Sequence, residues 1–440
     1  MRRLTDFRMS WWIWTSGVAT ALVAASTLFA AERSPLGQAL KDLEPADHWI
    51  YDDWPRAVAE ARQSGKPLWV VVRCVPCPPG RTLDQAVAQP DPELAALQKQ
   101  FVCVRLIQAN SLDLTLFQYD YDISWSALFM NADGTIYGRY GSRKSSGPSS
   151  DNLLSLAALR KAAERALALH AAYPSNREAL QGKLGPRPAY RTPRDIPGLH
   201  DKPPQASAQT HNSCIHCHMV KEYALRAKWQ AGRLTEDDLY VYPLPEQVGL
   251  SLDLEDGLTV RTVEPDSPAA AAGVKAGDRL ESLGGQPLIS LADVQWVLHH
   301  APHNGTLPIE VSRDGRKLSL ALTLQGPWKK SDIAWRVSSW YALRQGLKTE
   351  PLSAAQRAQR GLPPHGMALE VKGLFGKGEP KLKAAGLKVG DVIVAMDGQS
   401  ADMNESEFLV ALRVRHGPQD AVRLTVLRHG QRQELTIPMW

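Results

Sequence analysis

The sequence predicts a multidomain protein of mixed α/β and α+β class, with an α/β unit in its first half and two smaller β-rich modules in its second. A continuous apolar run at 67–73 follows a capped helix, as a buried strand of an α/β sheet does. A ten-residue pattern beginning at residue 271 recurs at residue 384, which indicates an internal repeat. The proline-rich stretch at 176–209 separates the two halves and predicts an extended linker.

The first 31 residues predict either a signal peptide or a membrane anchor. Arg2, Arg3 and Arg8 precede an almost uncharged run from Trp11 to Ala31, which is the layout of an export signal. The run is also about long enough to span a bilayer. In both cases we expect a periplasmic or extracytoplasmic protein, with anchoring to the inner membrane as the alternative. The formal net charge of +5 is too small to indicate nucleic-acid binding.

Residues 45–175 are predicted to form the α/β unit. Asp53 can cap a helix that ends at Gly65, and Thr82 and Asp91 mark the starts of two more helices. Cys103 lies in a predicted buried strand, where it is expected to be a small core residue. The other predicted elements are a strand over 101–107, a hairpin of 125–130 with 135–140, and a helix over about 151–170.

The strand at 67–73 ends in Cys74-Val75-Pro76-Cys77, a CxxC pair. A helix, a strand with a terminal CxxC, a helix, a strand, a hairpin and a helix follow one another as in the thioredoxin fold, and residues 45–175 resemble that superfamily. The resemblance implies a thioredoxin-like α/β sandwich in which Cys74 is the nucleophile and Cys77 resolves the mixed disulfide. The residues alone leave a static disulfide or a metal-binding thiol pair open.

The chain departs from the thioredoxin pattern in two places. Pro78, Pro79 and Gly80 follow the CxxC directly, so the next helix is predicted to begin nearer Thr82 than the cysteines. The family places a cis-proline before the hairpin, and residues 122–126 contain no proline. Both departures favour the alternative of a degenerate, non-catalytic thioredoxin fold.

A second cysteine pair lies in the segment 210–240, where Cys214-Ile215-His216-Cys217-His218 has the CxxCH pattern of c-type haem attachment. Haem c is therefore a predicted cofactor, held by Cys214 and Cys217 with His218 on the iron. The alternatives are a local disulfide, a metal-binding dithiol, a zinc site shared by both CxxC pairs, or disulfide exchange between the pairs. The sixth ligand of a haem iron is left open by the sequence, with His211 and His200 as candidates.

The internal repeat predicts two related modules at 241–326 and 327–440. The sequence AAGVKAGDRL at 271–280 recurs as AAGLKVGDVI at 384–393. Each copy continues with a capped helix, over 290–299 and over 404–412, and with a closing hairpin.

These modules resemble PDZ domains of the bacterial periplasmic-protease kind. The resemblance implies that each module receives a polypeptide C-terminus or an extended peptide as an added strand. In the first copy the residues that match the carboxylate-binding loop are Val248, Gly249, Leu250, Ser251 and Leu252. In the second copy the candidate loop is 335–337, and 352–362 resembles the extra helix of such PDZ domains. The alternative is that the modules pack against the rest of the chain and bind nothing.

An export leader, a thioredoxin-like unit and two PDZ-like modules in this order resemble a bacterial group of exported thioredoxin-like/PDZ proteins, some of which carry selenocysteine in the redox motif. The resemblance implies redox chemistry at Cys74 and Cys77. We therefore expect a thiol-disulfide oxidoreductase-like protein that recruits polypeptides through its PDZ domains. The alternative is a non-catalytic scaffold with a degenerate thioredoxin fold.

Overall fold

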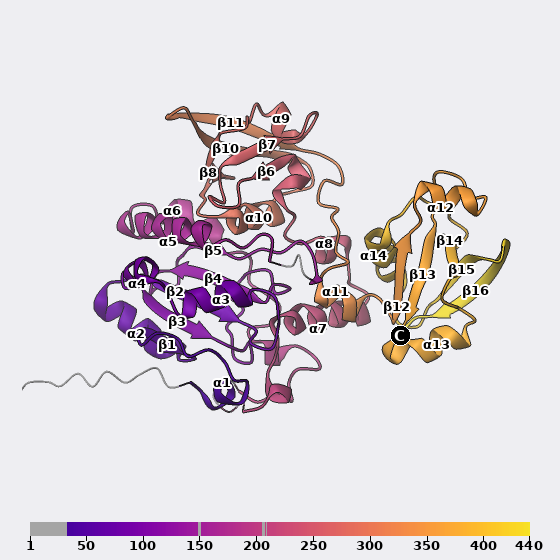
Figure 1. Ribbon diagram of the computed structural model, residues 1–440, viewed down its shortest axis with the longest axis horizontal. Coiled ribbons are helices and arrows are strands. Elements are labelled where there is room, and N and C mark those ends of the chain that lie inside the picture. The colour runs from indigo at the N-terminus through magenta and orange to yellow at the C-terminus, as the bar shows by residue number, and fades with distance from the viewer. Residues whose placement is uncertain (1–32, 148–150, 205–206, 208) are drawn as a thin grey trace, which may run out of the picture.

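The computed structural model describes residues 33–147, 151–204, 207 and 209–440. The predicted leader at 1–31 lies outside these described residues. Figure 1 shows three bodies, with the first domain on one side, the second above it and the third set apart on the opposite side. Within the described ranges, no helix is both long and apolar enough to cross a bilayer.

The first domain is built on a five-stranded sheet of order β1-β3-β2-β4-β5. Strands β1, β3 and β2 are parallel, and β4 and β5 form the predicted antiparallel hairpin. Its elements are α1 (Pro35–Ala39), β1 (Trp49–Tyr51), α2 (Trp54–Ser64), β2 (Leu68–Arg73), α3 (Arg81–Ala88), α4 (Pro92–Gln98), β3 (Val102–Leu106), β4 (Trp125–Met130), β5 (Ile136–Tyr140) and α5 (Leu156–Ala171).

Both faces of this sheet are covered, and the CxxCH segment helps to cover one of them. Helices α3, α4 and α5 pack on one face around Trp69 and Phe129. On the other face, α2 packs beside a later segment that contributes Ile215 and Val220 to the same hydrophobic core. The segment 210–240 was predicted as a separate unit, but its beginning forms part of the first domain.

The prediction of an extended linker at 176–209 was wrong for most of the stretch. The described residues there form α6 (Arg177–Leu180) and short 3-10 turns, and Leu180, Ile196 and Leu199 are buried. These three apolar residues pack into the hydrophobic clusters on the two faces of the first domain's sheet. The buried ammonium of Lys183 lies 2.8 Å from the carboxylate of Asp293 in the second domain, so the segment joins the two.

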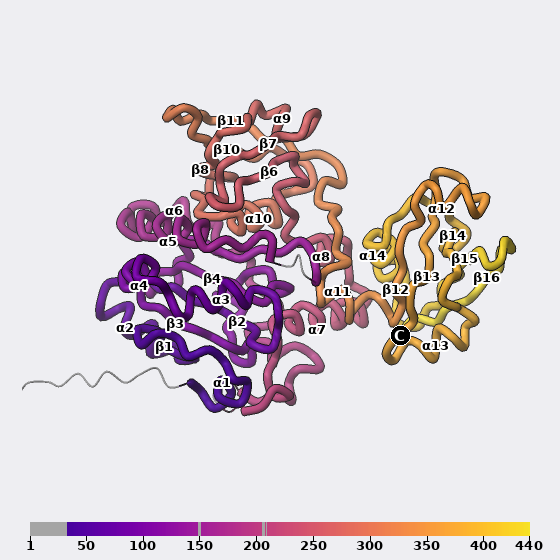
Figure 2. Tube along the Cα trace, in the orientation of Figure 1, coloured from indigo at the N-terminus to yellow at the C-terminus, as the bar shows by residue number. Residues whose placement is uncertain are grey.

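Three helices connect the domains. These are α7 (Cys217–Gln230), α8 (Glu236–Leu239) and α11 (Val337–Ala342). The tube in Figure 2 follows the chain from α7 and α8 into the second domain and back through α11, which packs against α7 before the third domain begins.

The second and third domains repeat one design. The second contains β6 (Leu250–Leu252), β7 (Val260–Val263), α9 (Pro268–Ala271), β8 (Arg279–Leu283), β9 (Gln286–Pro287), α10 (Leu291–His300), β10 (Gly305–Arg313) and β11 (Arg316–Leu324). The third contains β12 (Leu347–Pro351), α12 (Ala354–Gln359), β13 (Leu369–Leu374), α13 (Glu379–Ala384), β14 (Val392–Met396), α14 (Glu405–Arg415), β15 (Ala421–Arg428) and β16 (Gln431–Pro438). The predicted caps of α10 and α14 are confirmed, because Ser290 and Asn404 accept backbone N–H groups there.

An identical ion pair ties the repeated GD dipeptide to the closing hairpin in both copies. Asp278 accepts the Nε of Arg313 at 2.6 Å, and Asp391 accepts the Nε of Arg428 at 2.6 Å. Burial alone would raise the pKa of Asp278, but the hydrogen bond from the Arg313 guanidinium lowers it below its usual value. The shared geometry confirms that the two sequence repeats are one structural module used twice.

Both modules are attached to the rest of the protein through the same kind of helix. Helix α10 lies against β5 of the first domain, where Asp293 accepts the backbone N–H of Arg139 at 3.1 Å (Figure 1). Helix α14 packs beside α7 and α8, with the guanidinium of Arg413 4.2 Å from the ring centroid of Trp229. One alternative was that the modules pack against the rest of the chain and bind nothing. The packing part of that alternative is observed.

Candidate active site

The CxxC pair lies at the end of β2, where the buried strand meets the surface. Cys74 and Cys77 form a disulfide. The pair lines a cavity of about 380 Å³. The other residues around this cavity are Pro78, Pro79, Tyr121, Asp122, Ile123, Ser124, Arg143, Gly147, Cys217, His218 and Val337. The Cys74–Cys77 disulfide, Cys217 and His218 therefore face one space.

The two cysteines differ in exposure. Cys74 is buried and Cys77 is half-buried. The thioredoxin resemblance implies that Cys74 meets the substrate first, whereas here Cys77 is the more exposed residue. Helix α3 begins only at Arg81, close to the predicted start, because the Pro-Pro-Gly sequence intervenes after Cys77.

A buried arginine lies directly beneath the motif. Arg73 donates to the backbone carbonyls of Pro79, Ser124 and Cys77 at 2.9, 3.0 and 2.8 Å. Its Nε also donates to Asp84 at 3.1 Å. Burial lowers the pKa of the Arg73 guanidinium, and the Asp84 carboxylate opposes that shift. Arg73 thus holds the loop around the disulfide, a role for which the only sequence signal is a charge at the end of an apolar strand.

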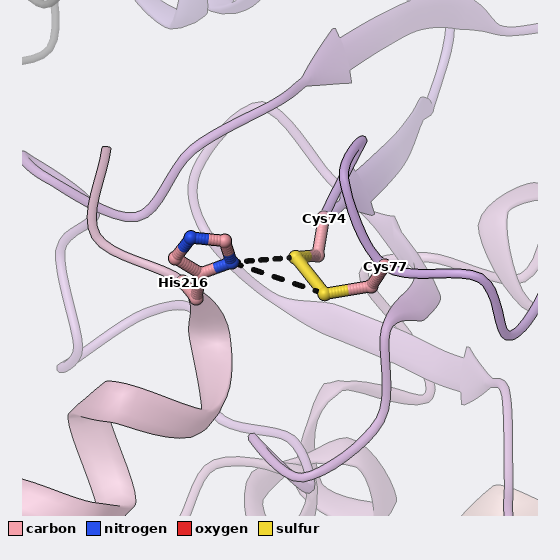
Figure 3. A group of neighbouring side chains, drawn as sticks. All are labelled: Cys74, Cys77 and His216. Atoms are coloured by element: carbon pink, nitrogen blue, oxygen red, sulfur yellow. Dashed lines mark hydrogen bonds between the residues drawn. A yellow bond between two sulfur atoms is a disulfide. The ribbon is translucent and has the colours of Figure 1, made fainter. Parts of the chain in front are cut away.

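His216 is the residue of the CxxCH that touches the disulfide. Its Nδ1 lies 3.1 Å from the Sγ of Cys74 and 3.8 Å from the Sγ of Cys77 (Figure 3). Burial, helped by the neighbouring His218 and His211, lowers the pKa of His216 to about 4. No sequence pattern selects this residue, because it occupies a variable position of the CxxCH motif.

Asn110 sets the position of His216. Its side-chain oxygen accepts the N–H of Ile215 at 2.7 Å, and its amide donates to the carbonyl of Ser213 at 2.7 Å. His216 then occupies the N-cap position of α7. The buried Asn110 therefore fixes the strand-like segment that carries the imidazole to the CxxC, which lies more than 130 residues away in sequence.

The thiols of Cys214 and Cys217 are free and lie in different hydrophobic clusters. Cys214 is 2% exposed, beside Leu36 and Tyr51, and burial raises the pKa of its thiol to about 12. Cys217 is 4% exposed and accepts a hydrogen bond from the hydroxyl of Tyr119 at 3.2 Å. Burial also raises the pKa of the Cys217 thiol.

This arrangement does not fit a covalently attached haem. Attachment needs both thiols to face one porphyrin, with His218 on its iron. Cys217 and His218 line the cavity, but Cys214 lies outside it in a separate apolar cluster. His218 stacks on Tyr341, and its Nδ1 lies 3.7 Å from the carboxylate of Glu222. The CxxCH motif predicts haem c, and the placement of Cys214 argues against it.

The loop opposite the CxxC is held from the third domain's side. Ser124 occupies the place of the family's cis-proline, and its carbonyl accepts the N–H of Cys74 at 2.9 Å. Arg336, which precedes α11, donates to Asp120 at 2.8 Å and to Asp122 at 3.2 Å. The middle residue of the candidate loop 335–337 is therefore engaged in a buried ion pair with the first domain.

The predicted peptide-binding residues of the second domain form β6 and the turn that leads into it, since Val248 and Gly249 directly precede the strand. Val248, Leu250 and Leu252 are buried in that domain's core, and Ser251 is half-buried. Gly249 adopts φ 84°, and a Cβ atom there would lie 2.1 Å from Ser267. The loop therefore requires glycine.

The equivalent loop of the third domain is at 345–347 and not at the predicted 335–337. Gly346 accepts the backbone N–H of Phe375 at 2.8 Å, as Gly249 accepts that of Glu264 at 2.8 Å. The loop escaped the sequence comparison because a glutamine precedes its glycine where the first copy has valine.

Comparisons with known proteins match the same parts of the chain. A family model described as thioredoxin-like matches residues 49–132, and one described as a PDZ domain matches residues 247–324 and 377–439. The probable periplasmic serine endoprotease DegP-like of Pseudomonas savastanoi pv. phaseolicola is 30% identical over 202 residues, 44% of this chain and 40% of that protein. The periplasmic serine endoprotease DegP of Escherichia coli is 29% identical over 176 residues, 38% of this chain and 34% of that protein.

Among solved structures, the serine endoprotease from Yersinia pestis is 26% identical, with a TM-score of 0.17, and the match covers 18% of this chain and 28% of that chain. The chain spans at most 40% of the length of the two curated relatives. The predicted fold class is confirmed, and the chain carries a thioredoxin-like domain followed by two PDZ domains.

Proposed function

We propose that this protein is an extracytoplasmic thiol-disulfide oxidoreductase whose reactive group is the Cys74–Cys77 disulfide and whose PDZ domains recruit a polypeptide. The observation that supports this proposal most is the placement of the disulfide. It lines an open cavity, with the charge of Arg73 beneath it and the imidazole of His216 against Cys74. Titratable groups gathered around a cleft are typical of functional sites.

The exposure of the sulfurs gives the order of the exchange. A substrate thiolate attacks the Sγ of Cys77, the accessible sulfur; the new sulfur–sulfur bond forms as the Cys74–Cys77 bond breaks, and Cys74 leaves as a thiolate. A second substrate thiolate then attacks the substrate sulfur of the mixed disulfide and releases Cys77. The substrate is oxidised to a disulfide, and its two protons pass to the two cysteines.

Two side chains stabilise the thiolate of Cys74 as it forms. The Nδ1 of His216 is within hydrogen-bond distance, and an N–H at that atom donates to the leaving sulfur. Arg73 adds a buried positive charge while it fixes the loop carbonyls. A lower thiolate energy makes Cys74 a better leaving group and the disulfide more oxidising.

The PDZ domains and the relatives support recruitment and location. PDZ domains bind extended peptides or C-termini by strand addition, and β6 begins directly after the loop glycine. The curated relatives are periplasmic by name. We therefore place the protein in the periplasm, where a folded polypeptide with exposed thiols is the expected substrate, with the leader as its export signal or inner-membrane anchor.

The second candidate is a non-catalytic scaffold. It is favoured by Ser124, which stands where thioredoxins carry the substrate-docking proline, and by the packing of α10 and α14 against the rest of the chain. A scaffold would keep the Cys74–Cys77 disulfide permanently closed.

The test is disulfide turnover by the full chain. We expect the protein to accelerate the reduction of insulin by dithiothreitol and to equilibrate with a glutathione buffer. Cys74→Ser and Cys77→Ser should each abolish turnover. Cys103→Ser is the matched control, because this buried thiol lies away from the site and its hydrogen bond to the Gln98 carbonyl suits a hydroxyl.

The accessible sulfur is identified by trapping. In the Cys74→Ser protein the remaining Cys77 should form mixed disulfides readily, and in Cys77→Ser the buried Cys74 should react far more slowly. The opposite order would restore the roles that the thioredoxin resemblance implies. A disulfide that resists reduced glutathione and gives no turnover would support the scaffold.

A further inference from the structure

The side chains of Cys74, Cys77 and His216 together resemble a set of metal ligands, a property that disulfide exchange does not use. Cys74, Cys77 and His216 offer two sulfurs and one imidazole nitrogen that all lie within 4.8 Å of one another. The imidazole reaches the pair from a segment 139 to 142 residues away in sequence. In Figure 3 the Nδ1 of His216 points at the sulfurs and the second ring nitrogen points away.

The distances match those of a metal site. With metal–sulfur bonds of about 2.3 Å and metal–nitrogen bonds of about 2.0–2.1 Å, a tetrahedral ion separates sulfur from nitrogen by about 3.6 Å. The nitrogen lies 3.1 Å from one sulfur and 3.8 Å from the other, on either side of that value. Once the disulfide is reduced, the sulfurs need only move apart to a similar spacing.

The surroundings favour a soft ion. Two thiolates with one imidazole are ligands that select Zn²⁺ or Cu⁺ over the hard cations. Cys74 and Cys77 line the cavity, which leaves a coordination position open on its side. Among the described residues, neither the Cys214 thiol nor the Cys217 thiol belongs to such a group of three ligands.

We propose that the reduced protein binds one soft metal ion, Zn²⁺ or Cu⁺, through Cys74, Cys77 and His216, and that oxidation of the pair abolishes the site. A dithiol reductant first gives two electrons and two protons to the disulfide and is itself oxidised to a disulfide. The two thiols then release their protons as the metal–sulfur bonds form, and the imidazole supplies the third bond. The inference shares a reducible Cys74–Cys77 bond with the proposed function but does not require its turnover.

The experiment is a metal titration of the full chain, reduced and freed of reductant without oxygen. Zn²⁺ and Cu⁺ are titrated separately in competition with a colorimetric chelator, which also distinguishes the two ions. We expect one equivalent of metal per chain, and X-ray absorption should show two sulfur ligands and at least one nitrogen ligand. The oxidised wild-type protein should bind none, a control that needs no substitution and so cannot fail to fold.

Variants assign the ligands. Cys74→Ser and Cys77→Ser should each lose the site, whereas Cys103→Ser should keep it. His216→Ala should weaken binding at least tenfold, since loss of a mere outer-shell partner already costs about 10- to 100-fold. His211→Ala is its matched control, because this ring lies beside His216 but outside the ligand set.

Three results would overturn the inference. They are binding that survives both CxxC substitutions, binding by the oxidised protein, and a His216→Ala protein with wild-type affinity. Metal binding without insulin turnover would keep this inference while removing the proposed enzyme activity. Insulin turnover without metal binding would remove this inference and keep the proposed enzyme activity.

Discussion

Arg336 offers the sharpest test of how the chain just before the third domain is held against the candidate active site. Its guanidinium is 3% exposed and pairs with Asp122, which is 0% exposed, and with Asp120. Substitution by methionine keeps much of the volume but leaves two buried carboxylates without their cation. Breaking a buried ion pair by removing one partner costs about 3–5 kcal/mol. Arg336→Met should therefore destabilise the protein by about that amount at neutral pH.

Two features limit this cost. Ser338 continues to donate its N–H and hydroxyl to Asp122, each at 2.8 Å. Burial raises the pKa of Asp120, so this carboxyl can take up a proton when its cation is removed. The destabilisation should shrink as the pH falls, and Asp120→Asn should recover about 1–2 kcal/mol in the double variant, as coupled neighbours do.

The assay is unfolding by guanidinium chloride, followed through tryptophan fluorescence. Lys317→Met is the matched control, because its pair with Glu310 is exposed and should be worth less than about 1 kcal/mol. A shift for Arg336→Met no larger than that of Lys317→Met would refute the reasoning. So would a double variant that is no more stable than Arg336→Met alone.

Three further predictions follow from the described geometry. Burial alone would raise the pKa of Asp256, but hydrogen bonds and the ion pair with Arg165 hold it at about 2, so its folded-state pKa is depressed. The stability that the Asp256 carboxylate contributes should be present above pH 4 and lost as the pH falls towards 2. The difference in unfolding midpoint between wild type and Asp256→Asn should therefore vanish over that pH range. A difference that does not change with pH would contradict this prediction. Gly249→Ala should destabilise the second domain by about 1–3 kcal/mol and abolish its peptide binding, because the new Cβ meets Ser267 at a positive φ. Fluorescence titration with C-terminal peptides and thermal unfolding measure both effects, and wild-type behaviour in both would show that the loop tolerates a side chain. Protein made in a haem-maturing host should show no Soret band and no covalent haem mass, because Cys214 is enclosed in its apolar cluster, and a haem adduct would refute that placement.

Local patterns in the sequence were sufficient for many helices and hairpins of the three domains, but not for α1 and β1 of the first domain. The caps at Asp53, Asp91, Ser290 and Asn404 are observed where side-chain chemistry predicts them, because an N-cap depends on residues within one turn. The CxxC was likewise visible, as a pair at the end of a buried strand.

The composition of the site was not predictable in the same way. His216 faces Cys74 only because Asn110 binds the backbone around Ile215, a contact between residues 105 apart. The CxxCH pattern selects His218, whereas the imidazole that contacts the disulfide belongs to His216. Pattern reasoning could not supply the tertiary contact that brings this segment onto the first domain's sheet.

The prediction of an extended linker at 176–209 was wrong for a related reason. Its prolines and charges indicated an exposed chain, yet Lys183 is buried opposite Asp293. A single ion pair of this kind fixes a segment that composition alone assigns to solvent, and its two partners are 110 residues apart.

The packing of α10 and α14 also sets a condition on multivalent ligands. With each PDZ domain fixed through a helix, the distance between their two binding edges is set by the body of the protein and not by a flexible tether. Linking two weak contacts raises the effective concentration only when the ligand can span the gap between the sites. A polypeptide that presents two C-termini would thus gain avidity only if the distance between them matches the distance between the two PDZ domains. This protein would then select partners by that distance as well as by sequence.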